Sequence, residues 1–377
     1  SKIVFLCSLI MLWLLFILAI YAPYLFWADR THKSFRKKME GSIKAEGEIH
    51  QPLSIIIPFR NENGTVQKLV NQLLIQISGF ENCEVILVND HSTDGGEEAI
   101  GNLLPYKNVN FQLINAQKEG KKNALTEGIQ LAKNDWIVTL DADISIPALW
   151  MDFVAKTCAN APTDMVILPV DIFPYPKFYQ KIEALEFTVL QGITFGYAQQ
   201  QKPILANGAH LAFKKKAFFD FSGYSSHEHM ASGDDVFFME QLQLSESHSV
   251  GYSYCHDMSV STEPSSSFMQ LLNQKIRWGS KTFKFKSNDV KRIGVLILTA
   301  NLALFPLFYF GNWRIFALGF FIKSACDLYL VLFPLTARSR KTLLKYIPLF
   351  MVVYPFYITF VSVATLFLKP KWKGRKI

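Results

Sequence analysis

The chain has 377 residues, of which 50% are hydrophobic and 19% are charged. An ordinary soluble domain carries about 25% charged residues, so this composition favours a membrane protein. The net charge is +8, but the basic residues gather beside long apolar runs. This arrangement indicates contact with membrane lipids, and we expect no nucleic-acid partner. The five cysteines are scattered, so we expect neither a disulfide framework nor a zinc site.

Residues 1–28 are expected to form an N-terminal transmembrane helix. The run from Ile3 to Ala28 carries no charge and is long enough to cross a hydrocarbon core about 30 Å thick. A signal peptide has its basic residues before a shorter apolar core, so we expect a retained helix. The basic residues follow instead, in an expected juxtamembrane linker, 29–50. The positive-inside rule then places the N-terminus outside and the next residues in the cytoplasm.

Residues 51–292 have the pattern of a soluble α/β domain. Short apolar, β-branched runs end in polar residues at 53–58, 84–90 and 136–141, and apolar residues recur with helical spacing over 66–77. Alternating strands and helices predict a parallel sheet, in which ligands bind beyond the carboxyl ends of the strands. The polar residues expected at that edge are Arg60, Glu62, Asp90, His91, Asp94, Asp141 and Asp143.

Residues 293–368 are expected to form a C-terminal membrane region of about three helices, followed by a basic tail, 369–377. Four spans that start outside return the C-terminus to the outside, whereas the basic tail favours the inside. A re-entrant or interfacial segment would reconcile the two cues, so the number of spans stays open. We expect a multi-pass protein of the plasma or inner membrane whose catalytic domain is cytoplasmic.

Asp141-Ala142-Asp143 places two carboxylates at the end of a predicted strand. Such a pair can hold Mg²⁺ or Mn²⁺ together with nucleotide phosphates. Because Asp-x-Asp is also common in turns, the interpretation depends on the other motifs of the chain. These are Asp90 with its turn, Gly120-Lys121-Lys122-Asn123-Ala124-Leu125, Gly233-Asp234-Asp235 and Gln274-Lys275-Ile276-Arg277-Trp278.

In order and spacing, these motifs resemble those of family 2 glycosyltransferases. The subgroup is the membrane one of cellulose, chitin and hyaluronan synthases, ceramide glucosyltransferase and the chitooligosaccharide synthase of nodulation. The resemblance covers about Leu53 to Trp278. It implies the GT-A fold, an α/β domain with a nucleotide-binding, mostly parallel sheet. It also implies inverting, metal-dependent transfer of a sugar from a nucleotide-diphosphate donor, with a UDP-sugar as the first expectation.

The resemblance also implies how the donor is bound. Asp90 would contact the nucleotide's base or ribose, and Lys121 would assist in nucleotide binding. Asp141 and Asp143 would hold the diphosphate and the metal ion, Mg²⁺ or Mn²⁺. Arg277 would lie near the diphosphate and complete the nucleotide-sugar site.

On the acceptor side, the resemblance makes Asp235 the general base that deprotonates the acceptor hydroxyl. Gln274 and Trp278 would bind the acceptor, with Trp278 as a flat platform for a sugar. One departure is Asp234, where the family commonly has Glu or Thr. We expect Asp234 to point away from the site, because neighbouring residues on a helix do not share a face.

Several alternatives remain open at this point. The acceptor is a growing glycan, as in polysaccharide synthases, or a lipid that receives one sugar. A catalytically inactive glycan or nucleotide sensor is the rival outside the enzyme class. Residues 171–200 form either an interfacial amphipathic helix or a buried core helix. The histidines of 227–229 are read as part of a solvated loop, and Lys323 with Asp327 as an ion pair or a contact for a glycan or lipid headgroup.

Overall fold

The computed structural model describes residues 2–40, 51–80, 82–104, 110–198, 202–221, 223, 233–253, 255–282, 284–310, 312–337, 340–368, 371–372 and 375–376. The histidine-containing segment 227–229 lies outside them. The chain divides into two compact units. We call residues 38–175 and 197–264 the sheet unit, and residues 1–37, 176–196 and 265–377 the helical unit. This division differs from the expected 51–292 domain, because 176–196 and 265–292 pack with the terminal helices.

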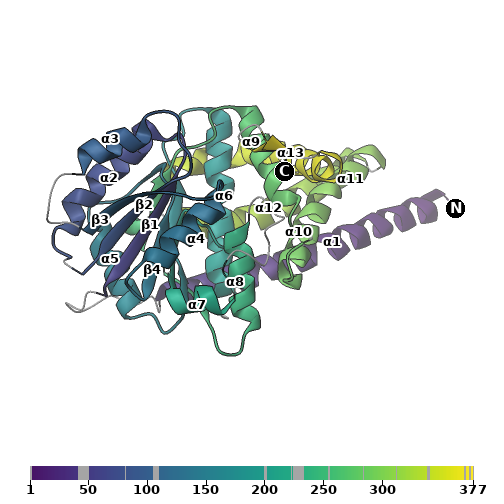
Figure 1. Ribbon diagram of the computed structural model, residues 1–377. Helices are drawn as coiled ribbons and strands as arrows, with labels where there is room; N and C mark the ends of the chain where they lie inside the picture. The colour runs from purple at the N-terminus through teal and green to yellow at the C-terminus, as the bar shows by residue number, and fades with distance from the viewer. Residues whose placement is uncertain are drawn as a thin grey trace. The chain divides into compact units, whose positions relative to one another are not determined.

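The sheet unit is built on a seven-stranded sheet with the order β3-β2-β1-β4-β8-β6-β9, of which Figure 1 labels β1 to β4. The pairings of β1 with β2 and β4, of β2 with β3 and of β6 with β9 are parallel. Among the described strands of this sheet, only β8 pairs antiparallel, with β4 and β6. Their bounds are β1 Leu53–Phe59, β2 Glu84–Asn89, β3 Asn110–Asn115, β4 Trp136–Leu140, β6 Met165–Ile167, β8 His210–Lys214 and β9 Val250–Tyr252. The predicted α/β class with a mostly parallel sheet is confirmed.

The strands β1, β2 and β4 form where the apolar runs predicted them, and every residue of the three is buried. Such runs suit a sheet that is covered on both faces. The register sets Phe59 opposite Asn89, so the loops that follow β1 and β2 leave the same edge. His210, the first residue of antiparallel β8, pairs with Leu140, the last residue of β4. The residues just before β8 therefore reach this edge too.

The helices of the sheet unit are α2 Asn63–Ile77, α3 Gly96–Leu103, α4 Lys121–Leu131, α5 Trp150–Ala159, α7 Lys215–Asp220 and α8 Asp234–Leu244. A small second sheet joins β5 Ile144–Ser145, β10 Val260–Thr262 and β7 Val170–Ile172. Helix α4 packs on β1 and β2 at Gly128. A Cβ there would lie 2.7 Å from Cγ2 of Ile56 and 3.0 Å from Cγ2 of Val88, so only glycine permits this close approach.

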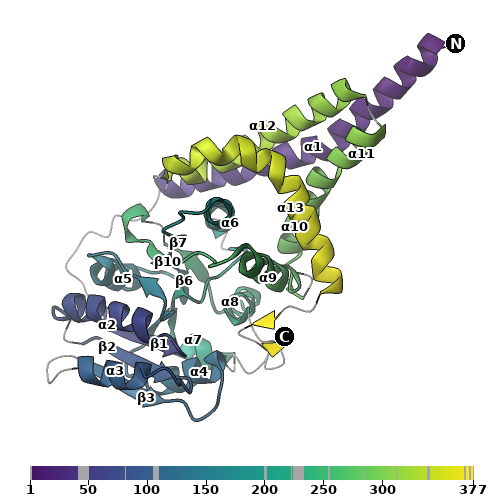
Figure 2. The ribbon, with the colours of Figure 1, turned by 90° about the horizontal axis from the view of Figure 1, so that it is seen from above.

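The helical unit contains α1 Lys2–Glu40, α6 Phe178–Ala198, α9 Phe268–Gly279, α10 Asn288–Leu302, α11 Leu304–Phe310, α12 Trp313–Ala337, the 3₁₀ helix η3 Lys341–Tyr346 and α13 Ile347–Phe367 (Figure 2). A short pairing of β11 Lys371–Trp372 with β12 Arg375–Lys376 follows. Among the described residues, four segments are long and apolar enough to cross a membrane: Ile10–Ser34, Asn288–Phe310, Trp313–Thr336 and Lys341–Phe367. Helix α1 continues beyond residue 28 into the basic segment.

Polar residues join the long helices of this unit. Lys323 is fully buried and forms an ion pair with Asp327, at 2.5 Å. Asp327 also accepts a hydrogen bond from the Tyr24 hydroxyl of α1, at 2.8 Å. The ion-pair interpretation of Lys323 and Asp327 therefore describes the structure. Helix α6 has most of its side chains buried, among them Leu185 and Phe195, which favours a core helix over an interfacial one.

Candidate active site

The loops after β1 and β2 are fastened to each other beside Asp90. Asn61 and His91 both adopt left-handed backbone conformations, with φ of 54° and 58°. The Asn61 side-chain oxygen accepts the backbone N–H of Thr93 at 2.8 Å. Asp94 accepts the backbone N–H of Asn63 at 2.8 Å. Asparagine tolerates the left-handed region better than most residues, so this sequence suits a tight connection between the two loops.

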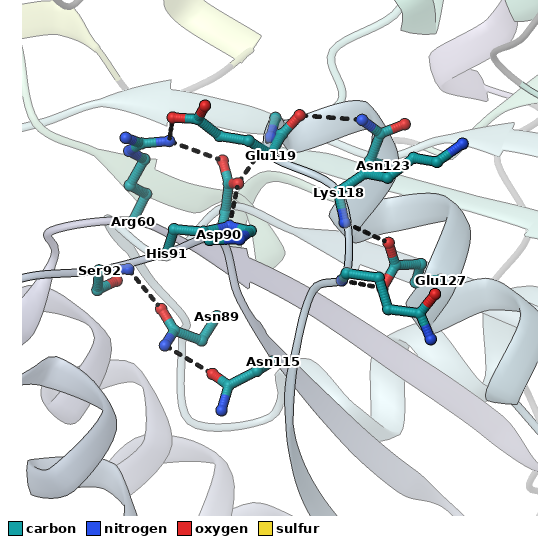
Figure 3. Close-up of polar contacts among 12 residues, drawn as sticks. Arg60, Asn89, Asp90, His91, Ser92, Asn115, Lys118, Glu119, Asn123 and Glu127 are labelled. Carbon is teal, nitrogen blue, oxygen red and sulfur yellow. Dashed lines mark hydrogen bonds and ion pairs between the residues drawn. The ribbon is translucent and has the colours of Figure 1, made fainter.

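Asp90 follows β2 and is buried. Its Oδ1 accepts the backbone N–H of Gly120 at 2.7 Å, and its Oδ2 lies 3.8 Å from a guanidinium nitrogen of Arg60. Figure 3 shows the guanidinium of Arg60 directed at both Asp90 and Glu119. Arg60 forms its closer ion pair with Glu119. The backbone thus fixes one oxygen of the Asp90 carboxylate, while the other faces a cation at the edge of the sheet.

Asp141 follows β4 and forms an ion pair with Lys121, the first residue of α4. Asp143 is two residues further on and is exposed to solvent. Although Asp143 reaches solvent, partial loss of hydration, and then the carboxylate of Asp141, raise its pKa to about 6. Loss of hydration disfavours the charge of Lys121, but Asp141, Asp143 and Asp235 outweigh it and raise the pKa of its ammonium. The three acids and the lysine therefore act on one another.

Two carboxylates that disfavour each other's charge suit a divalent cation. Among the residues that the structure describes, no group of three or more His, Cys, Asp or Glu side chains is arranged to hold a metal ion. Asp141 and Asp143 would therefore supply only part of a coordination shell. Phosphate oxygens and water would supply the rest, as is usual for Mg²⁺ sites. The residues present fit such an ion.

Asp235 lies in the first turn of α8, after Gly233, whose φ is 91°. Its Oδ2 accepts the backbone N–H of Gly208 at 2.8 Å, and its Oδ1 accepts that of Val236 at 3.0 Å. Gly208 lies two residues before β8 and so belongs to the sheet edge described above. Burial, and to a lesser extent the carboxylate of Asp234, raise the pKa of Asp235, against the opposing hydrogen bond from Gly208.

Asp234 was expected to point away from the site, and the structure shows where its carboxylate lies. It forms an ion pair with Lys122 at 2.7 Å, and each of the two side chains is only 19% exposed. Sequence reasoning did not connect these residues, because they are far apart in the chain. Within the sheet unit, the structure brings together the predicted residues Asp90, Lys121, Asp141, Asp143 and Asp235.

Gln274, Arg277 and Trp278 lie on α9 of the helical unit. Trp278 is 37% exposed, and its ring centre lies 4.5 Å from the ammonium of Lys275. Lys275 is buried and forms an ion pair with Glu186 of α6 at 2.7 Å. Sequence reasoning missed this pair, although a lysine between apolar positions of an amphipathic helix is the signal that points to it.

His210 is a buried titratable group near the same edge, and its bonds exclude it as a base. Its Nδ1 donates to the carbonyl of Pro169 at 2.9 Å, and its Nε2 accepts the indole N–H of Trp150 at 2.9 Å. Burial lowers the pKa of His210 to about 3. The imidazole is therefore neutral with both nitrogens in use, which is a structural role.

Residues 54–221 match the sequence model of the family described as Glycosyl transferase family 2. Glycosyltransferase AglE of Haloferax volcanii is 26% identical over 234 residues, which are 60% of this chain and 71% of that protein. The poly-beta-1,6-N-acetyl-D-glucosamine synthase of Staphylococcus epidermidis is 32% identical over 105 residues, 28% of this chain and 24% of the synthase.

A solved structure shares the fold. It is the mannosyltransferase PcManGT from Pyrobaculum calidifontis in complex with GDP-Man and Mn²⁺. The TM-score is 0.59 at 16% sequence identity, and the match covers 93% of this chain and 98% of that one.

Proposed function

We propose a reaction for this chain, which belongs to glycosyl transferase family 2, has the GT-A fold and is therefore a glycosyltransferase. In this reaction it transfers a sugar from a nucleotide-diphosphate donor to a glycan hydroxyl, with inversion of the anomeric carbon and with Mg²⁺ or Mn²⁺ as the metal ion. One observation carries the proposal. Three carboxylates, those of Asp141, Asp143 and Asp235, act on the single ammonium of Lys121 at the carboxyl edge of the sheet. This set contains a cation site and a separate base.

On the donor side, Asp90 binds the base or ribose through the carboxylate oxygen that the Gly120 backbone leaves available. Asp141 and Asp143 hold the divalent ion, which when bound acts as a Lewis acid on the departing diphosphate. Lys121 adds a positive charge beside the same phosphates. The Mn²⁺ and GDP-Man bound by the mannosyltransferase of the same fold support a metal and a nucleotide sugar here. A UDP-sugar remains our first choice of donor.

On the acceptor side, Asp235 is the general base. Its carboxylate accepts the proton of the acceptor hydroxyl as the oxygen bonds to the anomeric carbon, and the bond to the diphosphate breaks with its electron pair. One base and one cation site suffice for such a direct displacement, which inverts the anomeric carbon. Asp141 and Asp143 are unsuitable as bases, since the cation uses their lone pairs.

The α9 residues also have roles in this proposal. Trp278 is exposed enough to stack against a sugar ring, while Lys275 covers one side of the indole. Gln274 binds the acceptor beside it, and Arg277 binds the diphosphate. The poly-beta-1,6-N-acetyl-D-glucosamine synthase among the relatives favours a growing glycan as the acceptor over a single transfer onto a lipid.

We further propose that the four apolar helical segments span a membrane and that the sheet unit is cytoplasmic. The basic residues that follow the first apolar run support this orientation.

The test uses the full-length protein in lipid nanodiscs with Mn²⁺ and radiolabelled UDP-N-acetylglucosamine, UDP-glucose or GDP-mannose. A ladder of labelled products supports glycan extension, and one lipid-mobile spot indicates transfer onto a lipid instead. Asp143→Asn is the matched control, because it keeps the shape of the side chain and removes a charge from the proposed metal site. Absence of both transfer and donor hydrolysis with all three donors contradicts the proposed function.

A further inference from the structure

The turn at residues 120–122 contacts three different acidic segments with three consecutive residues. The backbone N–H of Gly120 donates to Asp90 at the end of β2. The ammonium of Lys121 pairs with Asp141 at the end of β4. The ammonium of Lys122 pairs with Asp234 at the start of α8, at 2.7 Å. These segments are separate in the chain, so one turn fixes their spacing.

The contact of Lys122 differs from that of Lys121 in its environment. Side-chain exposure is 40% for Lys121 and 30% for Asp141, but 19% for both Lys122 and Asp234. An ion pair that is partly withdrawn from solvent is less screened than an exposed pair, and removal of one partner leaves a charge without compensation. The Lys122–Asp234 pair therefore constrains the start of α8 more firmly than a surface pair does.

The start of α8 needs such a constraint because it carries Asp235. Gly233 enters the helix with a left-handed φ of 91°, and Asp234 is the first helical residue. The Asp235 carboxylate is held by the backbone N–H groups of Gly208 and Val236, at 2.8 and 3.0 Å. Val236 belongs to α8 itself, so only Gly208 among these two donors ties Asp235 to the sheet edge. The Lys122–Asp234 pair supplies a second tie, to α4.

From this arrangement we propose that Lys122 is a positioning residue: through Asp234 it holds the first turn of α8, and with it Asp235, at a fixed place relative to Asp141 and Asp143. The proposal rests on the proposed function, in which Asp235 is the base. Lys122 differs in this from Lys121, which pairs with Asp141 and to which the proposed function gives a phosphate contact. Asp234, the residue that departs from the family pattern, is the partner through which Lys122 acts.

The alternative role for Lys122 is direct contact with the diphosphate, and kinetics separate the two. A phosphate contact acts on donor binding, so its loss raises the donor KM and the nucleotide dissociation constant. A positioning role acts on the chemical step, so its loss lowers kcat while donor binding is kept. Misplacement of a catalytic group by about 1 Å can cost about 10²-fold in rate.

The test measures release of nucleoside diphosphate by the full-length protein with Mn²⁺ and either UDP-N-acetylglucosamine or GDP-mannose. Lys122→Met keeps the length of the side chain and removes its charge. We expect it to lower kcat about tenfold or more and to leave the donor KM within about threefold. Lys118→Met is the matched control, because Lys118 is an exposed lysine of the preceding loop that contacts Glu127 only through its backbone N–H. It should retain wild-type kcat.

A double-mutant cycle shows whether Lys122 acts through Asp234. Residues that act as one pair are non-additive, so Lys122→Met with Asp234→Asn should be no slower than the slower single variant. The pH profile adds a second readout. The charged groups that act on Asp235 are Asp234 of its own helix and Lys121 of α4. Removal of Lys122 takes one cation away from Asp234, so the Asp234 carboxylate should disfavour the charge of Asp235 more strongly and move the acid limb of the kcat profile to higher pH.

Three results overturn the proposal while the wild type turns over a donor: unchanged kcat in Lys122→Met, a raised donor KM with unchanged kcat, or additive losses in the double variant. Each leaves the proposed function standing. A wild type that releases no nucleoside diphosphate from either donor contradicts the proposed function itself and the role of Lys122 with it.

Discussion

Substitution of Asp235 by Asn tests the assignment of the base, and the structure shows that it has two separate effects. The carboxylate uses both oxygens, one for the N–H of Gly208 and one for that of Val236. An amide has one oxygen and an NH₂ group that only donates. One of the two backbone N–H groups therefore loses its acceptor. An unsatisfied donor costs about 1–3 kcal/mol where it is fully buried. These two hydrogen bonds are partly buried, so we expect the thermal midpoint of Asp235→Asn to fall by less than this full cost.

The loss in catalysis should exceed the loss in stability. A general base is worth roughly 10²–10⁴-fold in rate, which corresponds to about 3–5 kcal/mol in the activation barrier. Asp235→Asn should lose kcat by this factor and retain nucleotide affinity, because Asp90 and Lys121 are unchanged. The measurements are kcat with a labelled donor, nucleotide affinity by calorimetry and the thermal midpoint, with Asp234→Asn as the matched variant and a milder loss expected there.

Two outcomes would refute the reasoning. Turnover by Asp235→Asn at the wild-type rate shows that another group accepts the proton. Loss of nucleotide affinity with intact turnover at saturating donor shows that Asp235 belongs to the donor site.

Further expectations follow from the same contacts. Chelation of divalent ions should stop turnover, and Asp143→Ala should stop it even with excess Mn²⁺; full activity in chelator contradicts the metal site. In the metal-free protein the pKa of Asp143 is about 6, above its ordinary value of 3.8, so the fold favours the protonated form. The contribution of protonated Asp143 to the free energy of unfolding is present below about pH 4 and is lost as the pH rises through 6. Between pH 4.5 and 7.5 the thermal midpoint of Asp143→Asn should therefore decline less than that of the wild type. Tyr24→Phe removes a hydrogen bond to Asp327 and should cost about 0.6–2 kcal/mol, measured by thermal unfolding in detergent; no change contradicts a role for this bond. Protease added outside intact cells should leave residues 51–292 uncut, and cleavage there shows the opposite orientation.

The part of the site on the parallel strands was predictable from sequence for a physical reason. Strands that are covered on both faces need continuous apolar runs, and β1, β2 and β4 have them. Parallel strands place the residues that follow them at one edge, so Asp90 and Asp141 had to lie near each other. The order of the motifs then identified Asp235 as a further acid of the same site.

The remaining contacts depend on tertiary structure. The strand β8 runs antiparallel to β4, so the two residues before it bring the backbone N–H of Gly208 to the Asp235 carboxylate. Because glycine has no side chain, the sequence gives no signal of this contact. The pairing of Lys122 with Asp234 joins two surface-like charges that are distant in sequence. The membership of α6 and α9 in the helical unit was also hidden, because an amphipathic helix shows that it has a buried face but not which core covers it.

The contact of α4 with the sheet has a consequence for variants far from the chemistry. Gly128 lies two helical turns beyond Lys121, and its backbone rests on the β-branched side chains of Ile56 and Val88. These methyl groups cannot swing aside easily, so Gly128→Ala should lift α4 away from the strands by a few tenths of an ångström. The turn at residues 120–122 would move with the helix. Its contacts with Asp90, with Asp141 after β4 and with Asp234 of α8 would then loosen together. A glycine with no functional group should therefore score among the most sensitive positions for activity in a mutational scan, in a variant that still folds.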